Sequence, residues 1–213
     1  MAELKTEEEQ IEAFKVWWKK NGAKLVLAVA VCVSGYFGFQ AWQTSQENYR
    51  NEASSLYQNL IEAAANLTEE ENQQTVSFVA KQLKDDYADT SYAMFAQLFV
   101  ARIDAERGEY DNAIQSLESA ISSTDDASFI AIANLRIARL LLQKEDYSAA
   151  MERAEKVTEE EFVAQQQELI GDIFIAQGKR DDARTAYEKA SEALAAGVNH
   201  PLLSIKLQDL VKG

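Results

Sequence analysis

Residues 101–120 read ARIDAERGEYDNAIQSLESA, and the same pattern of small residues recurs twice further along the chain. The second copy is ARLLLQKEDYSAAMERAEKV at 138–157, and the third is GDIFIAQGKRDDARTAYEKA at 171–190. Equivalent alanines lie 37 and then 33 residues apart, at Ala113, Ala150 and Ala183. Small residues in mid-helix let two paired helices cross closely, so a repeat of this length predicts stacked helix pairs.

The three windows resemble the tetratricopeptide repeat, a helix pair of about 34 residues with an aromatic residue after its turn. Tyr110 and Tyr147 supply this aromatic, whereas Arg180 takes its place in the third window and Glu145 replaces the turn glycine in the second. We expect residues 47–87 to form one more, atypical pair that caps the stack. The predicted fold class is all-α, a tetratricopeptide-like α-solenoid.

Several local signals mark where helices begin. Thr68 with Glu71, and Thr158 with Glu161, have the spacing of a capping box. Pro201 predicts a last short helix that runs to about Lys212 and closes the stack. His200, directly before it, is expected to be a surface cap residue.

The N-terminal part predicts a single, uncleaved transmembrane helix. The stretch 25–46 carries no charged residue, and its most apolar part, LVLAVAVCVSGYFGF at 25–39, lacks a polar face. A helix of this length spans roughly 33 Å, which matches a hydrocarbon layer of about 30 Å. A cleaved signal peptide would end in small residues rather than in bulky aromatics, and a buried soluble helix would show a polar side.

The residues beside this helix predict its orientation. Four lysines precede it, and tryptophans flank both of its ends, at Trp17, Trp18 and Trp42. The positive-inside rule therefore predicts a cytoplasmic tail at 1–22, a transmembrane helix at 23–45 and a periplasmic repeat domain at 46–213. Small residues recur every fourth position along the helix and could admit a partner helix, although such residues are common in membrane helices: Ala30, Ser34 and Gly38.

Composition argues against several functional classes. The 213 residues carry 21 basic and 35 acidic side chains, a net charge of −14, which disfavours a nucleic-acid binder. One histidine and one cysteine do not supply the usual zinc ligands or a Cys/His nucleophile pair. Gly171 to Gly178-Lys179 does not fit the phosphate-loop spacing. We therefore predict a protein that is not an enzyme, with no catalytic residue, metal or cofactor.

The tetratricopeptide register predicts which residues line a partner-binding groove. The first helix of each pair would face it, presenting apolar side chains beside charges of both signs, a mixture suited to extended or partly unfolded protein. Alternatively, several of these apolar residues pack between repeats. Leu98 is not basic, so the carboxylate clamp of some such domains is missing. The candidate groove residues are Phe95, Leu98, Arg102, Ile132, Leu135, Arg139, Leu142, Gln165, Glu168, Asp172 and Ile175.

The opening TEEEQIEAFKVWWKKNG at 6–22, followed by one membrane span and an acidic repeat domain, resembles the YfgM family of gamma-proteobacteria. The closing HPLLSIKLQDL at 200–210, together with DTSYA at 89–93 and GKRDDA at 178–183, is also similar to that family. The resemblance implies an inner-membrane, ancillary subunit of the SecYEG translocon that also associates with PpiD, a membrane-anchored periplasmic chaperone. Such a subunit would help to pass translocated proteins, including client polypeptides, to the periplasmic chaperone network.

Two other functions remain open at this point. The cytoplasmic tail could act as an envelope-stress regulator, because Ile11, Phe14 and Trp18 share one helical face and the family's tail is linked to the Rcs response. The same face could instead lie along the membrane surface. The repeats could also serve as an assembly factor for another inner-membrane complex.

Overall fold

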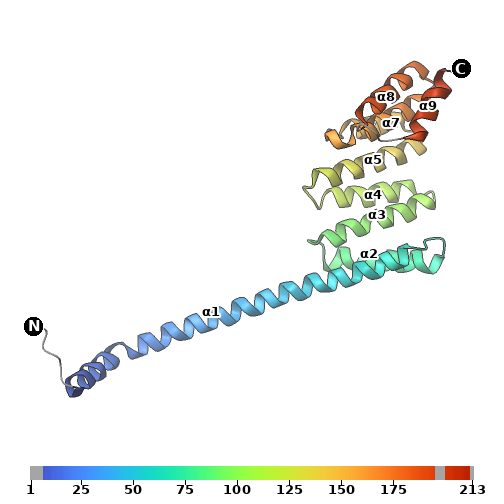
Figure 1. The fold of residues 1–213 in the computed structure, drawn as a ribbon. Helices are drawn as coiled ribbons and strands as arrows, with labels where there is room; N and C mark the ends of the chain where they lie inside the picture. Colours follow the sequence, from blue (N-terminus) through green and yellow to red (C-terminus); the bar gives the residue numbers. More distant parts are fainter. Residues whose placement is uncertain (1–6, 195–199, 212–213) are drawn as a thin grey trace, which may run out of the picture. The chain divides into compact units, whose positions relative to one another are not determined.

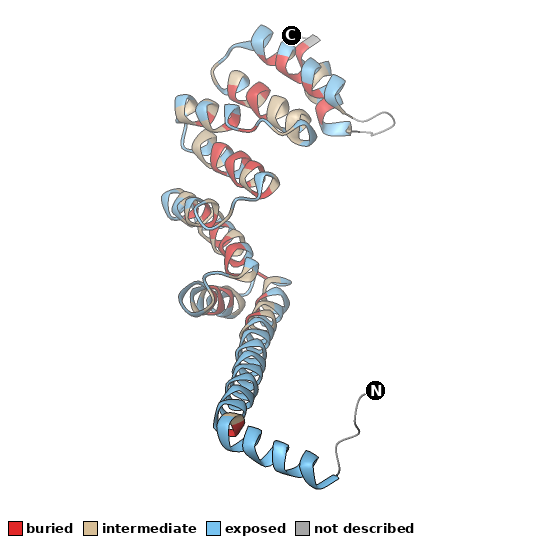
Figure 2. Cartoon of the chain, turned by 90° about the vertical axis from the view of Figure 1, so that its left-hand side faces the viewer, coloured by how far each residue is buried: buried red, intermediate tan, exposed pale blue. Residues whose placement is uncertain are grey.

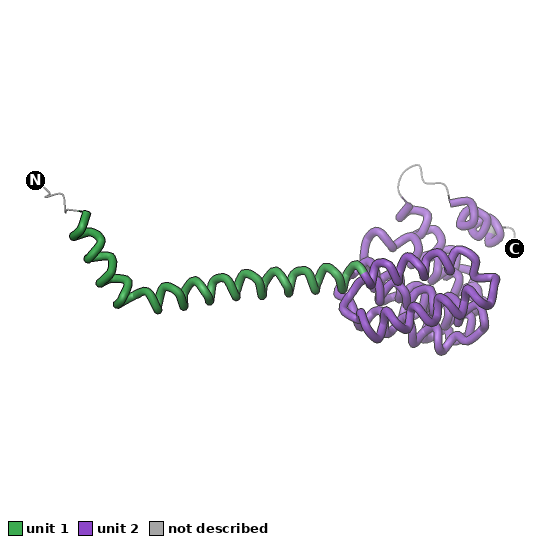
Figure 3. The backbone as a smooth tube through the Cα atoms, turned by 90° about the horizontal axis from the view of Figure 1, so that it is seen from below, with its two compact units in different colours: residues 1–51 green, residues 52–213 purple. Residues whose placement is uncertain are grey.

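The computed structural model describes residues 7–194 and 200–211, and within these ranges it contains helices and no strands (Figure 1). The chain forms two compact units, residues 1–51 and 52–213 (Figure 3). The helices in chain order are α1 Glu7–Ala64, α2 Glu70–Asp86, α3 Ser91–Glu106, α4 Tyr110–Ile121, α5 Ala127–Gln143, α6 Tyr147–Glu155, the short 3-10 helix η1 Glu160–Phe162, α7 Val163–Ala176, α8 Arg180–Ala193 and α9 Pro201–Val211. The predicted all-α fold class is confirmed.

In the first unit the described residues form one helical segment, the part of α1 before residue 52. Its side chains are exposed almost throughout, including the large apolar ones such as Leu27, Val31 and Phe37 (Figure 2). By length and composition α1 is able to cross a membrane, which is what the uncharged stretch 25–46 predicts. Exposed apolar side chains on every side of a helix are what a lipid environment requires.

The second unit contains the predicted helix pairs α3/α4, α5/α6 and α7/α8, which pack against one another in chain order (Figure 1). The small residues that define the repeat lie at the crossings, and Ala113, Ala150 and Ala183 are each fully buried. Buried residues form separate clusters between successive pairs rather than one central core (Figure 2). This distribution is typical of a solenoid, in which each repeat contacts only its neighbours.

All three pairs turn in the same way. One residue between the two helices of each pair is the turn position, and the backbone amide of the next residue donates to a carbonyl five residues earlier. These hydrogen bonds run from Glu109 to Asp104, from Asp146 to Leu141 and from Lys179 to Phe174. This pattern is the Schellman motif, which requires a left-handed backbone at the turn position. Gly108 and Gly178 have φ of 78° and 76°, and Glu145 has 61°, so the glutamate adopts a conformation that glycine would adopt without strain.

The part of α1 from residue 52 onward pairs with α2, as predicted for the atypical cap. Ala53 and Leu60 of α1 are fully buried in one cluster with Val76 and Leu83 of α2. The hydroxyl of Tyr87, directly after α2, donates to Glu52 at 2.9 Å. This pair therefore closes the N-terminal end of the stack.

Helix α9 closes the other end, as the sequence predicts, with Leu203 and Leu210 buried against α8. Its start at Pro201 is also as predicted, while the expected end at Lys212 lies outside the described residues. The ring of His200 caps the helix, because its Nδ1 accepts from the amide of Leu203 at 3.1 Å.

The two predicted capping boxes are wrong. Thr68 donates to Asn66 instead, and α2 begins after Glu69 without a side-chain cap. Glu161 accepts from Ser128 of another helix at 2.5 Å. Besides His200, side chains that cap helices in the described residues are Thr90, Asp126 and Asp146, at the starts of α3, α5 and α6.

Candidate partner-binding groove

A row of aromatic side chains runs along the first helices of the N-terminal pairs. The ring of Tyr57 on α1 lies 5.4 Å from that of Tyr92 and 6.5 Å from that of Phe99, both on α3. Phe95, also on α3, lies 5.7 Å from Phe129 on α5. Phe95 is 38% exposed, so this aromatic row is accessible from solvent at its middle. Aromatic faces of this kind supply much of the binding energy in protein interfaces.

Beside this row lies a small pocket of about 290 Å³, which we call the arginine pocket. Its floor and walls are aliphatic, and three arginines line it, one from α3 and two from α5. The pocket residues are Leu98, Ala101, Arg102, Ala105, Leu117, Arg136, Arg139 and Leu140. Leu98, Arg102 and Arg139 are predicted groove residues that the structure brings together.

The three arginines place positive charges close together at the pocket. Arg102 pairs with Glu106 one turn away at 2.8 Å, whereas within residues 7–194 and 200–211 no ion pair joins Arg136 or Arg139 to a carboxylate. Burial lowers the pKa of Arg136, and the charges of Arg139 and Arg102 lower it further. Arg136 was missed by the repeat register, although its spacing of three residues from Arg139 places both on one helix face.

The other predicted groove residues of α5 lie at different depths. Ile132 is half-buried, and Leu142 is half-buried against the cluster shared with α6 and α7. Leu135 is 3% exposed and belongs to that cluster, so its side chain packs between repeats and is not available to a partner. The alternative that some of these apolar positions serve the repeat interfaces therefore applies to Leu135.

In the third window two predicted groove acids contact α9. The Nζ of Lys206 lies 2.8 Å from Glu168 and 2.7 Å from Asp172, and His200 Nε2 lies 3.3 Å from Glu168. Burial alone would lower the pKa of Lys206, but hydrogen bonds to these two carboxylates outweigh it and raise the pKa. These contacts fasten α9 to α7 within the chain.

The two remaining residues of that window, Gln165 and Ile175, are exposed, Ile175 to 41%. Both lie on α7, beyond the arginine pocket in chain order. They stay predicted groove residues.

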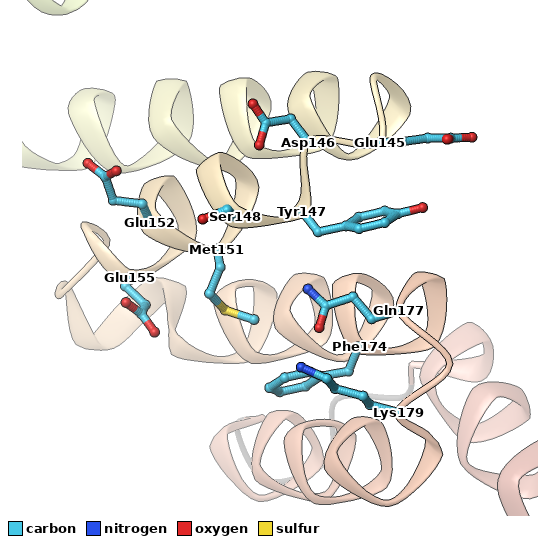
Figure 4. A pocket seen from close by; sticks show the side chains of 10 residues that line it. All are labelled: Glu145, Asp146, Tyr147, Ser148, Met151, Glu152, Glu155, Phe174, Gln177 and Lys179. Atoms are coloured by element: carbon cyan, nitrogen blue, oxygen red, sulfur yellow. The ribbon is translucent and has the colours of Figure 1, made fainter.

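A wider hollow of about 920 Å³ lies between α6 and α7 (Figure 4). Met151 and Phe174 line it and also pack in the core, while Lys179 lies with its Nζ 5.8 Å from the centre of the Phe174 ring. Asp146 on its edge caps α6 by accepting from Ala149 at 3.1 Å. These side chains therefore have structural roles, and we do not assign a ligand to the hollow.

The small-residue stripe of α1 remains a prediction. Ala30, Ser34 and Gly38 are all exposed, and a Cβ added at Gly38 would meet no atom within 4 Å. No metal-binding group of three His, Cys, Asp or Glu side chains is found in residues 7–194 and 200–211.

Known proteins resemble this chain over almost its whole length. A protein of Haemophilus influenzae named ancillary SecYEG translocon subunit is 29% identical over 96% of this chain and 97% of its own. Proteins of the same name from Neisseria gonorrhoeae and Escherichia coli are 28% identical over 99% and 100%, and 26% identical over 96% and 96%. The sequence profile of the tetratricopeptide repeat-like domain matches residues 15–212. The resemblance to the YfgM family is thereby confirmed, and the chain belongs to the tetratricopeptide repeat-like domain family.

Proposed function

We propose that this protein is a non-catalytic scaffold anchored in the bacterial inner membrane at the SecYEG translocon. In this role it binds a PpiD-like periplasmic chaperone and helps to pass translocated proteins to the periplasmic chaperone network. Relatives that match nearly the full chain carry the name of ancillary SecYEG translocon subunits, which supports a translocon-associated role.

The observation that carries the proposal is the presence of two kinds of surface in one chain. An apolar helix able to cross a membrane is followed by stacked helix pairs with an accessible aromatic row and an arginine pocket. Stacked pairs of this kind bind peptide and protein segments along their inner helices. The combination fits a binding module held at a membrane.

The proposed topology follows the charges that flank the apolar stretch. Residues 1–22 with Lys15, Lys19 and Lys20 lie in the cytoplasm, 23–45 span the membrane and 46–213 lie in the periplasm. Anchoring beside the translocon raises the effective concentration of the repeats at its exit, so that weak contacts with emerging chains are sufficient. A transient hand-over benefits from such weak contacts, because a tightly held chain would be released slowly.

The test is a purification of the tagged full-length protein in mild detergent, with partners identified by mass spectrometry. The expected result is that SecY, SecE and SecG co-purify together with a PpiD-like chaperone. A variant without residues 1–46, exported as a soluble domain, shows which of these contacts the repeats make alone. Recovery of a different membrane complex in place of SecYEG would contradict the proposal.

A second variant separates the scaffold from a tail-based regulator. Removal of residues 1–14 retains Lys15, Lys19, Lys20 and the apolar stretch, so the proposed scaffold and its orientation stay intact and SecYEG should still co-purify. Complete loss of SecYEG from this variant would mean that the tail, with its exposed Ile11 and Phe14, makes the essential contact.

A further inference from the structure

The arginine pocket is unusual for the domain in which it lies. Residues 47–213 contain 16 basic and 30 acidic side chains, so most of the surface repels anionic partners. Within this acidic domain, Arg102, Arg136 and Arg139 converge on one pocket from two helices. Three like charges at one pocket attract an anionic partner, and among the described residues one carboxylate, Glu106, forms an ion pair with these guanidinium groups.

The aliphatic neighbours of the arginines reduce the screening of their charge by water. Arg136 is exposed to solvent but lies beside aliphatic side chains, which partly desolvate its guanidinium group and leave its charge less screened than on an open surface. Leu98 and Leu140 are half-buried at the same place, and Leu117 below them is 1% exposed. A ligand that fills this pocket must therefore offer an apolar group to the floor and negative charge to the rim.

We infer that the arginine pocket binds an extended, acidic segment of a partner protein, with an aliphatic side chain on the floor and carboxylates on either side of it. Because the guanidinium groups come from both α3 and α5, carboxylates that flank the aliphatic residue reach more of them than a single anion would. A guanidinium group forms bidentate hydrogen bonds with a carboxylate, which adds geometric specificity to the binding energy of such a site. The inference rests on the proposed function and deepens it by naming the chemistry of the segment that the groove takes.

The accessible ring of Phe95 favours a protein segment over a small anion. It lies one helical turn before Leu98 on α3, so a chain in the pocket can continue over the aromatic row. The domain's excess of acidic side chains also provides specificity, because it disfavours binding of an acidic segment over much of the remaining surface.

The experiment measures fluorescence anisotropy of short labelled peptides with the full-length protein in detergent. The probe peptide carries a leucine between two glutamates, and its matched peptide has glutamines in place of the glutamates. A third peptide has glycine in place of the leucine. We expect the acidic peptide to bind about tenfold more tightly than the glutamine peptide, with an affinity that falls as salt rises. The glycine peptide should bind more weakly than the acidic one.

Variants assign the effect to the pocket. The double variant Arg136→Gln with Arg139→Gln should lose the preference for glutamate, whereas Arg139→Lys, which keeps the charge, should retain part of it. The control Lys189→Gln removes one positive charge from an exposed position of α8 and should bind like the wild type. Thermal melting by circular dichroism establishes that each variant is folded. Equal affinity for both peptides, no binding of the acidic peptide, or an equal loss in the control would overturn the inference.

The same variants separate this inference from the proposed function. Co-purification of SecYEG measured on the double variant reports the translocon role independently of peptide binding. If SecYEG co-purifies with the wild type but the wild type binds the glutamate and glutamine peptides equally, the inference is overturned and the proposed function stands. If SecYEG does not co-purify with the wild type, the proposed function is contradicted, regardless of the peptide affinities.

Discussion

The ring of Tyr187 on α8 lies directly against the backbone of Gly171 on α7. A Cβ built at position 171 would be 2.3 Å from Tyr187 Cε1, a distance that side-chain atoms do not adopt. The two earlier repeats use Ala101 and Ala138 at the position of Gly171. In this last repeat the smaller residue on one helix thus compensates for the larger residue on the other, since core volume is conserved.

This relationship predicts that Gly171→Ala destabilises the protein. In an exposed helix the same change would stabilise by up to about 1 kcal/mol, but here the added methyl group overlaps the tyrosine ring. Overpacking of this kind costs roughly 1–3 kcal/mol, so the net effect should be a lower free energy of unfolding in urea. The double variant with Tyr187→Ala should lose the clash. An alanine variant as stable as the wild type would show that the ring moves aside at little cost.

The turn after α5 predicts that a change to glycine raises the free energy of unfolding. Glu145 has φ of 61°, a region that costs an L-residue roughly 1–2 kcal/mol, while glycine adds flexibility to the unfolded chain. Glu145→Gly should therefore raise the free energy of unfolding by roughly 0.5–1 kcal/mol. The control Gln115→Gly lies at an exposed position inside α4 and should lower it by about 1 kcal/mol. A destabilised Glu145→Gly variant would contradict the strain assigned to this turn.

The contacts between α7, α8 and α9 predict a loss of stability at alkaline pH. Burial and the hydrogen bond of its hydroxyl to Asp172, at 2.7 Å, raise the pKa of Tyr187 above 10.0. For Lys206, burial lowers the pKa, but the hydrogen bonds to Asp172 and Glu168 outweigh it and raise the pKa above 10.5. A raised pKa means that the folded state holds the proton more tightly, so this stability is present below pH 10 and falls as the pH rises further.

Thermal melting at a series of pH values between 8 and 11 checks this prediction. The variant Tyr187→Phe removes the titrating hydroxyl and its bond to Asp172, so it should be less stable at pH 8 but show a shallower decline above pH 10. Identical slopes for the two proteins would show that Tyr187 does not contribute to the alkaline loss.

Two arginines of α8 predict how α9 is held at its end. Arg180 and Arg184 donate to the carbonyls of Asp209 and Leu210 at 3.1 and 2.5 Å, where the last carbonyls of a helix need partners. Replacing both with glutamine should cost about 1 kcal/mol per arginine, so α9 opens roughly fivefold more often for each. Hydrogen exchange by mass spectrometry of residues 201–211 measures this opening. The control Lys189→Gln should exchange like the wild type, and unchanged exchange in the arginine variant would refute the capping role.

The sequence predicted those features that depend on local periodicity. The spacing of Ala113, Ala150 and Ala183 is a property of the helices themselves, and the apolar stretch 25–46 is continuous, so both could be recognised without coordinates. The last helix, with its start at Pro201, was recognised for the same reason. These features need no knowledge of which distant residues meet.

Contacts between distant residues were not predicted. Arg180 departs from the aromatic of the repeat because it reaches Asp209, 29 residues away, and Lys206 neutralises Glu168 across 38 residues. The capping box at Thr158 failed for a related reason, because Glu161 accepts from Ser128 on another helix pair, whereas the box at Thr68 failed locally, because Thr68 donates to Asn66. Arg136 was missed because the register of one repeat does not show which side chains of two repeats converge. These partners are set by how the pairs stack.

Site-specific photo-crosslinking in living cells identifies the proteins that contact the repeat domain at the translocon. A photoreactive phenylalanine analogue is placed at Ile132, a predicted groove residue, and at Lys189 on α8 as the control. We expect position 132 to form crosslinks with a SecYEG subunit, a PpiD-like chaperone or a protein in transit, and position 189 to form none of these. Crosslinks confined to position 189, or to proteins unrelated to translocation at position 132, would contradict it.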